Sequence, residues 1–368
     1  MDPLGGLHHG ITARIVAAVN GLDMQVLEAG RVGEPVLLLL HGFPELAYSW
    51  RKVMPALAAA GFHVIAPDQR GYGRTTGWEA AYDADLSSFG MPNLVRDLLA
   101  LLHALRIPEV HAVIGHDFGS PVAACCALIR PDVFRRVVMM SSPFAGAPSW
   151  DPSPPDTVHE DLAALHPPRK HYQWYYATRS ANDDMLHAPQ GLHDFLRAYY
   201  HHKSADWPDN RPFELNAWTA EELAKLPTYY VMHRDATMAE TVAPHMPSTA
   251  QIAACRWLPD AELSTYTGEF ARTGFQGGLH WYRAQTEGFN ARELRLFSGR
   301  RIDVPSLFVA GTADWGVQQF PGALRRMRSA ACTDLRGVRL IDGAGHWIQQ
   351  EQPEAVTVAL LDFLGETA

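Results

Sequence analysis

The sequence predicts a doubly wound α/β fold, in which helices cover both faces of a mainly parallel sheet. Three observations favour this fold. Short continuous apolar runs, typical of strands buried on both faces, recur along the first 144 residues. Segments with helical spacing separate these runs. The strand pattern returns near the end of the chain, after residue 298. Alternation of this kind predicts strand–helix units that build a parallel sheet.

Six strands are predicted in the first part of the chain. Residues 11–28 predict two strands joined by Asn20-Gly21, a dipeptide typical of hairpin turns. Four apolar runs predict buried strands, at 35–40, 62–67, 110–114 and 137–140. Helical spacing predicts the intervening helices, at 49–60, 93–105 and 121–129.

The pattern changes after the sixth predicted strand. Residues 145–168 are rich in proline and predict an irregular linker, whereas residues 169–297 are rich in Tyr, Trp and His at mostly helical spacing. The core pattern then returns in two strands and a closing helix, at 304–310, 338–341 and 353–364. We therefore expect one α/β core made from residues 1–144 and 298–368, interrupted at 145–297 by the linker and a helical cap.

The amino-acid composition limits the classes of binding partner and the cellular compartment that we expect. A net charge of −9, a pI near 6.0 and the absence of long Lys/Arg runs argue against nucleic-acid or anionic-membrane binding. The apolar runs are too short for a membrane span, and the N-terminus lacks a signal-peptide pattern. Of the four cysteines, Cys125 and Cys126 are adjacent, and no Cys-x-x-Cys pair occurs. We expect reduced thiols, a cytoplasmic location and no metal ion.

Polar residues follow several predicted strands, at the sheet edge where open α/β folds bind their ligands. Residues 41–45 (HGFPE) follow one strand, and Asp117, Asp314 and His346 follow three others. Each signal alone is weak, because a Gly-x-Asp-x-Gly turn or a helix-capping Asp is common. Together they follow the order nucleophile, acid, histidine that accompanies a strand–turn–helix nucleophile elbow.

Several blocks of the sequence resemble the α/β-hydrolase superfamily and, within it, the soluble epoxide hydrolases. These blocks cover almost the whole chain: HGFPELAYSWR (41–51), PDQRGYGRT (67–75), GHDFGS (115–120), TGFQGGLHWYR (273–283), GTADWG (311–316) and GAGHW (343–347). The resemblance implies an α/β-hydrolase fold with a helical cap inserted after the sixth strand. It also implies an enzyme that converts a small apolar epoxide to a vicinal diol with water and without a cofactor.

An aspartate at the elbow, in place of the usual serine, changes the expected reaction. The Asp117 carboxylate can attack a saturated carbon and leave an alkyl ester, and its place at a helix N-terminus favours the ionised form. His346, oriented by Asp314, is then free to activate water for ester hydrolysis. By analogy with the elbow fold, the backbone N–H groups of Phe43 and Phe118 are expected to form the oxyanion hole.

The resemblance also implies two cap tyrosines that protonate the epoxide oxygen, because a phenol with a pKa near 10 is a suitable donor. Tyr282 in GGLHWYR matches the second of them. Tyr172 in HYQWYY resembles the first, with Tyr175 and Tyr176 as alternatives nearby. Glu45 matches a residue that positions the hydrolytic water in some relatives, and a helix-capping role is an equal alternative. The substrate-binding residues are expected to be aromatic: Phe43, Phe118, Trp174 and Trp347.

Haloalkane dehalogenase is the nearest alternative, because it also uses an elbow aspartate. Its halide needs N–H donors, which the side chains of Phe43 and Phe118 lack, although Trp174, Trp207 and Trp218 in the cap offer them. Fluoroacetate dehalogenases share HGFPE but place Arg directly after the nucleophile. A non-catalytic hormone-binding or scaffold protein is expected to lose a triad residue, and all three are present here. The sequence leaves open which epoxide is used, and whether the protein is a monomer or a homodimer.

Overall fold

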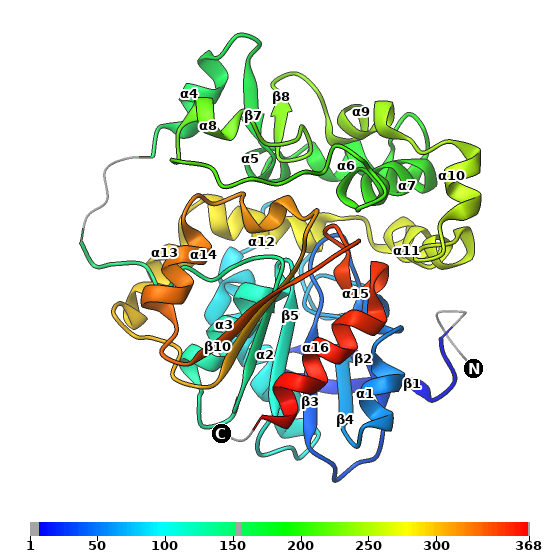
Figure 1. Ribbon diagram of the computed structural model, residues 1–368, viewed down its shortest axis with the longest axis vertical. Coiled ribbons are helices and arrows are strands. Elements are labelled where there is room, and N and C mark those ends of the chain that lie inside the picture. The colour runs from blue at the N-terminus through cyan, green and yellow to red at the C-terminus, as the bar shows by residue number, and fades with distance from the viewer. Residues whose placement is uncertain (1–6, 152–155, 367–368) are drawn as a thin grey trace.

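The computed structural model describes residues 7–151 and 156–366 (Figure 1). Within them an eight-stranded sheet runs in the order β1-β2-β4-β3-β5-β6-β9-β10. Its strands are β1 Ile11–Val19, β2 Leu22–Ala29, β3 Val36–Leu40, β4 His63–Pro67, β5 Ala112–His116, β6 Val137–Met140, β9 Ser306–Gly311 and β10 Leu335–Ile341. β2 is antiparallel to both β1 and β4, and the other neighbouring pairs are parallel. The predicted mainly parallel sheet is confirmed.

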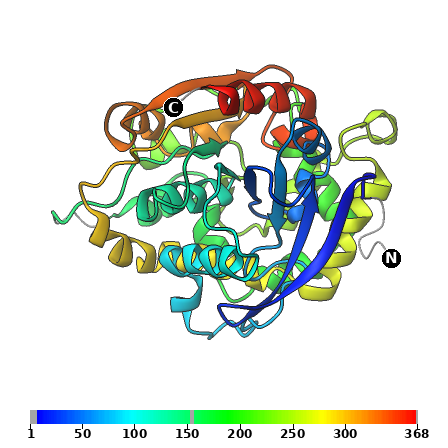
Figure 2. The same cartoon turned by 90° about the horizontal axis from the view of Figure 1, so that it is seen from below.

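Helices cover both faces of this sheet (Figure 2). α1 Met54–Ala59 and α16 Pro353–Gly365 pack together on one face, and α2 Met91–Ala104 and α3 Gly119–Ile129 pack together on the other. The side chains of β3 alternate between the two resulting cores: Leu38 and Leu40 join the α2/α3 core, whereas Leu37 and Leu39 join the α1/α16 core. Both faces of the strand are buried, which explains its continuous run of leucines.

Local backbone conformation explains two of the connections between the helices and strands. Asn20 and Gly21 both have positive φ, 50° and 82°, as a two-residue turn between β1 and β2 requires. The helix predicted at 49–60 is divided into a short turn, η1 Ala47–Trp50, and α1. Pro55 lies in the first turn of α1, where its missing N–H is tolerated, so a new helix begins there.

Between β6 and β9 the chain leaves the sheet and forms a cap above it (Figure 1). Ten short helices build the described part of the cap: α4 Val158–Ala164, α5 Tyr172–Tyr176, α6 Ala181–Leu186, α7 Leu192–Lys203, α8 Ala220–Leu223, α9 Met238–Val242, α10 Thr249–Ala254, α11 Asp260–Thr273, α12 Gln276–Thr286 and α13 Phe289–Leu294. The expected helical cap after the sixth strand is confirmed. Two strands that were not predicted, β7 Arg169–His171 and β8 Val231–His233, pair inside it.

The prediction that residues 145–168 are irregular is wrong for α4. Val158 and Leu162, one helical turn apart, are both buried, and the Asp156 carboxylate accepts a hydrogen bond from the N–H of Val158. Tertiary burial of this single apolar stripe stabilises a helix in a segment whose prolines suggested none. Residues 152–155 of the linker lie outside the described residues.

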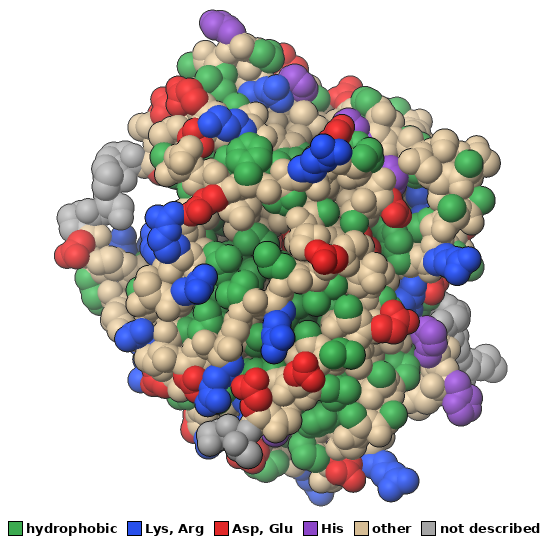
Figure 3. All heavy atoms as spheres, viewed as in Figure 1, with side chains coloured by type: hydrophobic (Ala, Val, Ile, Leu, Met, Phe, Trp, Pro, Cys, Tyr) green, Lys and Arg blue, Asp and Glu red, His purple; other side chains and the backbone are tan. Residues whose placement is uncertain are grey.

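The remaining helical elements are short and mostly connect the larger ones: η2 Leu86–Phe89, η3 Ala243–His245, η4 Arg295–Phe297, η5 Trp315–Val317, α14 Ala323–Arg326, η6 Met327–Ala331 and α15 Ile348–Glu351. On the face shown in Figure 3, acidic and basic side chains are interspersed over core and cap. None of the helices in the described part of the chain combines the length and the hydropathy of a membrane span.

Candidate active site

Asp117 lies in the sharp turn between β5 and α3. Its φ of 51° is in the left-handed region, which few non-glycine residues adopt and aspartate adopts more readily than most. The flanking glycines permit the turn: a Cβ on Gly115 would lie 2.0 Å from the carbonyl oxygen of Gly119, and one on Gly119 would lie 2.3 Å from that of Leu40. The Gly-x-Asp-x-Gly spacing therefore follows from close backbone contact on both sides of the aspartate.

The structure brings Asp117, His346 and Asp314 together from three strand ends. His346 Nε2 lies 3.1 Å from Asp117 Oδ2, and His346 Nδ1 lies 3.1 Å from Asp314 Oδ1. All three side chains are buried. Asp314 Oδ1 also accepts a hydrogen bond of 2.7 Å from the N–H of Gly316, so a second donor orients the carboxylate that faces the imidazole.

The electrostatics of this cluster favour ionised carboxylates. Burial raises the pKa of Asp117, but the hydrogen bond and charge of His346 and the charge of Lys203 outweigh burial and leave the pKa well below its usual range. The pKa of Asp314 is likewise lowered, because the charge and hydrogen bond of His346, together with hydrogen bonds from Ser141 and Gly316, outweigh burial. Burial and Lys203 lower the pKa of His346, whereas Asp314 and Asp117 raise it, with a net upward shift.

The loop after β3 supplies a backbone donor to the elbow. The N–H of Phe43 donates to Asp117 Oδ1 at 2.9 Å. Gly42 lies against the same group, because a Cβ there would be 2.3 Å from Asp117 Oδ1 and 2.7 Å from the backbone nitrogen of Phe118. The absence of a side chain at Gly42 thus allows the loop to approach both the carboxylate and the amide that follows it.

Two buried phenols lie above the elbow. Tyr172 belongs to α5 and Tyr282 to α12, and their ring centroids are 5.8 Å apart. The ring of Tyr282 makes edge contacts with Phe43 at 5.4 Å and with Phe118 at 5.1 Å. Burial, followed by neighbouring groups that include Asp117, raises the pKa of both tyrosines well above 10, so both hydroxyls remain protonated near neutral pH.

The hydroxyls of Tyr172 and of its two neighbouring tyrosines each donate a hydrogen bond to another side chain. The hydroxyl of Tyr172 donates to Gln319 Oε1 at 3.0 Å. The hydroxyl of Tyr175 donates to Asp184 at 3.1 Å, and that of Tyr176 donates to the Tyr199 hydroxyl at 3.2 Å. Asp117 contributes to the raised pKa of Tyr172, whereas the pKa values of Tyr175 and Tyr176 are raised by burial and by other neighbours. The geometry thus favours Tyr172 among the three alternatives.

Comparison with known proteins agrees with this geometry. A family model described as alpha/beta hydrolase fold matches residues 35–353. Epoxide hydrolase A of Mycobacterium tuberculosis (strain ATCC 25618 / H37Rv) is 37% identical over 361 residues, which are 96% of this chain and 97% of the relative. The chain belongs to the epoxide hydrolases of the α/β-hydrolase family.

Solved structures of the family superpose over nearly the full length. An epoxide hydrolase from an endophytic Streptomyces gives a TM-score of 0.79 at 31% identity and covers 97% of this chain and 96% of that chain. Epoxide hydrolase A from Mycobacterium thermoresistibile gives a TM-score of 0.75 at 33% identity, with 96% and 98% coverage. The cap is therefore included in the similarity to these epoxide hydrolases.

Glu45 is fully buried beneath the elbow. Its Oε2 lies 2.6 Å from His116 Nδ1 and accepts a hydrogen bond of 3.2 Å from the N–H of Gly42. Its Oε1 accepts hydrogen bonds from the side-chain amides of Gln349 at 2.9 Å and Gln350 at 3.3 Å. The adjacent turn η1 has no side-chain cap, so the helix-capping alternative for Glu45 gains no support.

The four predicted aromatic residues divide into two groups. Phe43 and Phe118 contact Tyr282, as described above, and Trp347 packs with its ring centroid 4.7 Å from that of His346. Trp174 instead stacks on His159, with centroids 5.3 Å apart. Because Trp174 follows Tyr172 by two helical positions, it projects from the other side of α5. The structure therefore does not bring Trp174 to the triad.

The other two cap indoles also have partners of their own. Trp218 Nε1 donates to the Asp156 carboxylate at 3.1 and 3.2 Å. The ring of Trp207 is edge-on to His202, with centroids 4.3 Å apart. The indole N–H of Trp218 is thus engaged elsewhere in the cap, and the ring of Trp207 packs against a cap histidine.

Three buried residues of this site were not predicted from the sequence. His116 Nε2 lies 2.7 Å from the carbonyl oxygen of His346, Gln319 binds Tyr172, and Lys203 contributes charge to Asp117 and His346. His116 stands next to the nucleophile in GHDFGS, which is a usable signal. Gln319 and Lys203 belong to no recognised block, so only the folded chain reveals them.

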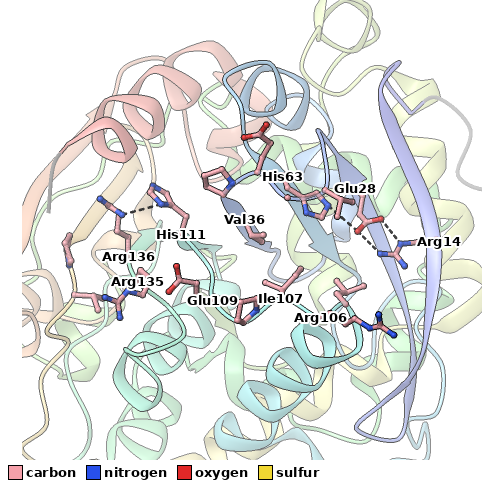
Figure 4. A pocket seen from close by; sticks show the side chains of 18 of the residues that line it. Arg14, Glu28, Val36, His63, Arg106, Ile107, Glu109, His111, Arg135 and Arg136 are labelled. Carbon is pink, nitrogen blue, oxygen red and sulfur yellow. Dashed lines mark hydrogen bonds and ion pairs between the residues drawn. The ribbon is translucent and has the colours of Figure 1, made fainter.

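A separate hollow of about 880 Å³ lies at the opposite end of the sheet (Figure 4). Its lining includes His63, His111 and Pro305, which stand at or just before the amino ends of β4, β5 and β9. Arg14 and His63 both lie within ion-pair distance of Glu28, at 2.6 and 3.5 Å. The triad lies at the carboxyl ends of the same sheet, and the two places are distinct.

Proposed function

We propose that this protein hydrolyses an apolar epoxide to a vicinal diol through an alkyl ester formed on Asp117. The observation that carries the proposal is the placement of an ionised elbow carboxylate beneath two protonated, buried phenols, Tyr172 and Tyr282. A carboxylate attacks saturated carbon, and phenols protonate an oxygen leaving group. The names of the relatives, which are epoxide hydrolases, support the same reaction.

In the first half-reaction, Asp117 Oδ2 attacks one carbon of the epoxide ring. The bond between that carbon and the ring oxygen breaks, and the oxygen takes a proton from Tyr172 or Tyr282. Asp117 Oδ1 remains on the N–H of Phe43, so attack uses the other carboxylate oxygen. The product of this step is a hydroxyalkyl ester, still covalently bound to the enzyme.

In the second half-reaction, His346 Nε2 accepts a proton from water, whose oxygen attacks the carbonyl carbon of the ester. The negative charge develops on Oδ1, where the N–H groups of Phe43 and Phe118 stabilise it. Asp314 stabilises the imidazolium. The ester bond then breaks, and the diol leaves with the proton from His346. The second proton of the water, left on the Asp117 carboxyl, passes to the tyrosinate formed in the first half-reaction, which restores both the aspartate and the tyrosine.

Glu45 supports the second half-reaction as a water-positioning residue. Its carboxylate holds the N–H of Gly42, next to the Phe43 donor, and holds His116, which contacts the carbonyl of His346. Within the described chain the Glu45 carboxylate makes four hydrogen-bond contacts with protein groups, so Glu45 acts on the water through the loop of Gly42 and through His116. Glu45 therefore aligns the water together with the loop that carries the oxyanion donor.

The remaining assignments follow from the same reaction. We assign residues 1–144 and 298–368 to the catalytic core and 145–297 to the linker and cap that cover the substrate. The rings of Phe43, Phe118 and Trp347 give the site its apolar wall. All four cysteines are free, which supports a cytoplasmic location. An apolar epoxide and water are the only partners proposed, and the protein works as a monomer or homodimer.

Product analysis tests the proposed function. The purified protein is incubated with an aryl epoxide and, separately, with a bromoalkane, and both diol and bromide are measured. We expect diol without bromide, and Asp117→Asn should abolish it, because an amide cannot displace the epoxide oxygen. Bromide release without diol would establish the dehalogenase alternative instead. Diol formation by Asp117→Asn at the wild-type rate would disprove the elbow assignment.

A further inference from the structure

Lys203 is a buried cation beside the triad. It ends α7 in the cap, and only 3% of its surface is exposed. Its ammonium lies over four aromatic rings, 4.9 Å from the centroid of Tyr230, 5.3 Å from Tyr199, 5.4 Å from Trp347 and 5.8 Å from Tyr229. Within residues 7–151 and 156–366, no carboxylate lies within 4 Å of it. Cation–π attraction therefore compensates part of its desolvation while leaving its charge unneutralised.

The backbone fixes this cation relative to the histidine. The carbonyl of Lys203 accepts a hydrogen bond of 2.9 Å from the N–H of His346. The Glu351 carboxylate accepts hydrogen bonds from the N–H groups of both Trp347 and Ala205, at 2.9 and 2.8 Å, and so joins the two segments. A Cβ on Gly345 would lie 2.7 Å from the carbonyl oxygen of Lys203. The histidine loop and the end of α7 therefore form one packed unit.

The charges around His346 are otherwise mainly negative. The groups that face it or its loop are the carboxylates of Asp117 and Asp314, the carboxyl of Glu351, whose pKa burial raises to about 7, the ring of His116 with Glu45 behind it, and the Lys203 ammonium. Asp117 and Asp314 both favour a protonated imidazole, but a general base must begin the second half-reaction neutral. A cation held nearby opposes that tendency and also stabilises the anionic nucleophile.

We propose that Lys203 is a positioning residue whose buried ammonium favours the neutral form of His346 and the ionised form of Asp117, as the two half-reactions require. The proposal rests on the proposed function, because only that reaction requires this pair of protonation states. Lys203 acts through His346 and Asp117, and it takes no part in bond making. It also gives the cap a role in catalysis beyond enclosing the substrate, because the cation comes from α7.

Histidine titration tests the proposal without any turnover. The NMR signals of His346 in ¹⁵N-histidine-labelled protein, assigned with His346→Gln, are followed against pH in the wild type and in Lys203→Met. Methionine keeps the length and apolar character of the stem in the aromatic cage. We expect the pKa of His346 to rise by about one pH unit when the charge is removed, and Lys203→Arg to restore it.

Lys170→Met is the matched control. The Lys170 ammonium also lies over a cap tyrosine, 4.7 Å from the ring of Tyr175, and among the described residues it makes no ion pair with the triad. Its removal should leave the pKa of His346 unchanged. If Lys203→Met does not fold, Lys203→Gln takes its place in the same titration. An unchanged pKa of His346 in the charge-free variant overturns the proposal.

The pH dependence of turnover provides a second test of the proposal. In Lys203→Met the acidic limb of the hydrolytic step should move to higher pH by the same amount, so ester on Asp117 should accumulate near pH 6. A merely structural lysine would lower the rate equally at all pH values, and that result also overturns the proposal. If the wild type opens no epoxide, the proposed function fails, yet the titration still decides whether Lys203 controls His346.

Discussion

Gly71 and Gly277 lie backbone against backbone where the turn after β4 passes beneath α12. A Cβ on Gly277 would lie 2.0 Å from the carbonyl oxygen of Gly71, and one on Gly71 would lie 2.6 Å from the carbonyl carbon of Gly277. Next to this contact, Trp281 Nε1 donates to the carbonyl of Arg70 at 3.0 Å. The distance between α12 and the core, and with it the position of Tyr282, therefore depends on the absence of side chains at Gly71 and Gly277.

Gly277→Ala should therefore lower activity. The added methyl group has only backbone to displace, so α12 must move, and Tyr282 moves with it. We expect a loss of about 1–3 kcal/mol in the free energy of unfolding and at least a tenfold slower ester formation. Gly268→Ala in α11 is the control, because no other segment of the described chain lies within 4 Å of its Cβ position. Equal behaviour of the two variants would contradict the role of the glycine contact.

His346→Gln should still form the ester but fail to hydrolyse it. Asp117 needs no base for its attack, whereas water needs the imidazole to remove its proton. Mass spectrometry of the peptide containing Asp117 should show an adduct equal to the mass of the epoxide. His103→Gln, at an exposed position of α2, should show no adduct. Absence of the adduct in His346→Gln would favour direct attack of water on the epoxide.

Tyr172→Phe and Tyr282→Phe should each slow ester formation, and the double variant should nearly stop it. Loss of a general acid typically lowers a rate by about 10²–10⁴-fold. Rapid-mixing measurements of the first half-reaction give the rate directly. Tyr175→Phe should retain the wild-type rate, because Asp117 is among the groups that raise the pKa of Tyr172 but not among those that raise the pKa of Tyr175. A larger effect at Tyr175 than at Tyr172 would reassign the first tyrosine.

His202→Phe should make the fold less sensitive to acid. His202 is fully buried, and neither ring nitrogen has a hydrogen-bond partner among residues 7–151 and 156–366. Burial, followed by the charges of His245, His201 and Lys203, lowers its pKa to about 2. Below pH 6.5 the unfolded chain binds a proton at this residue that the folded chain does not. Stability is therefore lost as the pH falls from 6.5 toward 2, by at most about 1.4 kcal/mol per pH unit.

Thermal unfolding between pH 7 and pH 5 measures this effect. The melting temperature of His202→Phe should fall less on acidification than that of the wild type. His193→Phe is the control, because His193 is partly exposed at the cap surface. Identical pH dependence in the wild type and His202→Phe would show that other groups control the acid response.

Sequence reasoning succeeded where a local pattern determines the structure. The run at 36–40 is continuous because β3 is buried on both faces, and Asp117 and His346 meet across 229 positions because both follow parallel strands of one sheet. The carboxyl ends of parallel strands lie at the same edge of the sheet, whatever the length and structure of the segments between them. The general position of the triad was therefore available from the order of the motifs.

No comparable sequence pattern predicts which cap residues reach the site. Trp174 and Tyr172 are two positions apart in an aromatic-rich segment, and only the orientation of α5 decides which of them meets Tyr282. Lys203 ends a helix whose sequence resembles an ordinary cationic C-terminus, favourable to the helix dipole. Its burial among aromatic rings arises from packing between distant segments, which periodicity does not reveal.

The two oxygens of Asp117 have different partners before any substrate binds: Oδ1 accepts from the Phe43 N–H, and Oδ2 faces His346 Nε2. A carboxylate held at both ends does not exchange its oxygens by rotation. Under the proposed mechanism, attack always uses the same position, which water then refills. In ¹⁸O-water the first diol should carry an unlabelled oxygen taken from the enzyme, and every later diol should carry the heavy isotope. Asp117 should then retain one light oxygen, Oδ1, through any number of cycles. One oxygen of this carboxylate is thus a permanent part of the protein, whereas the other is replaced by solvent oxygen in every cycle.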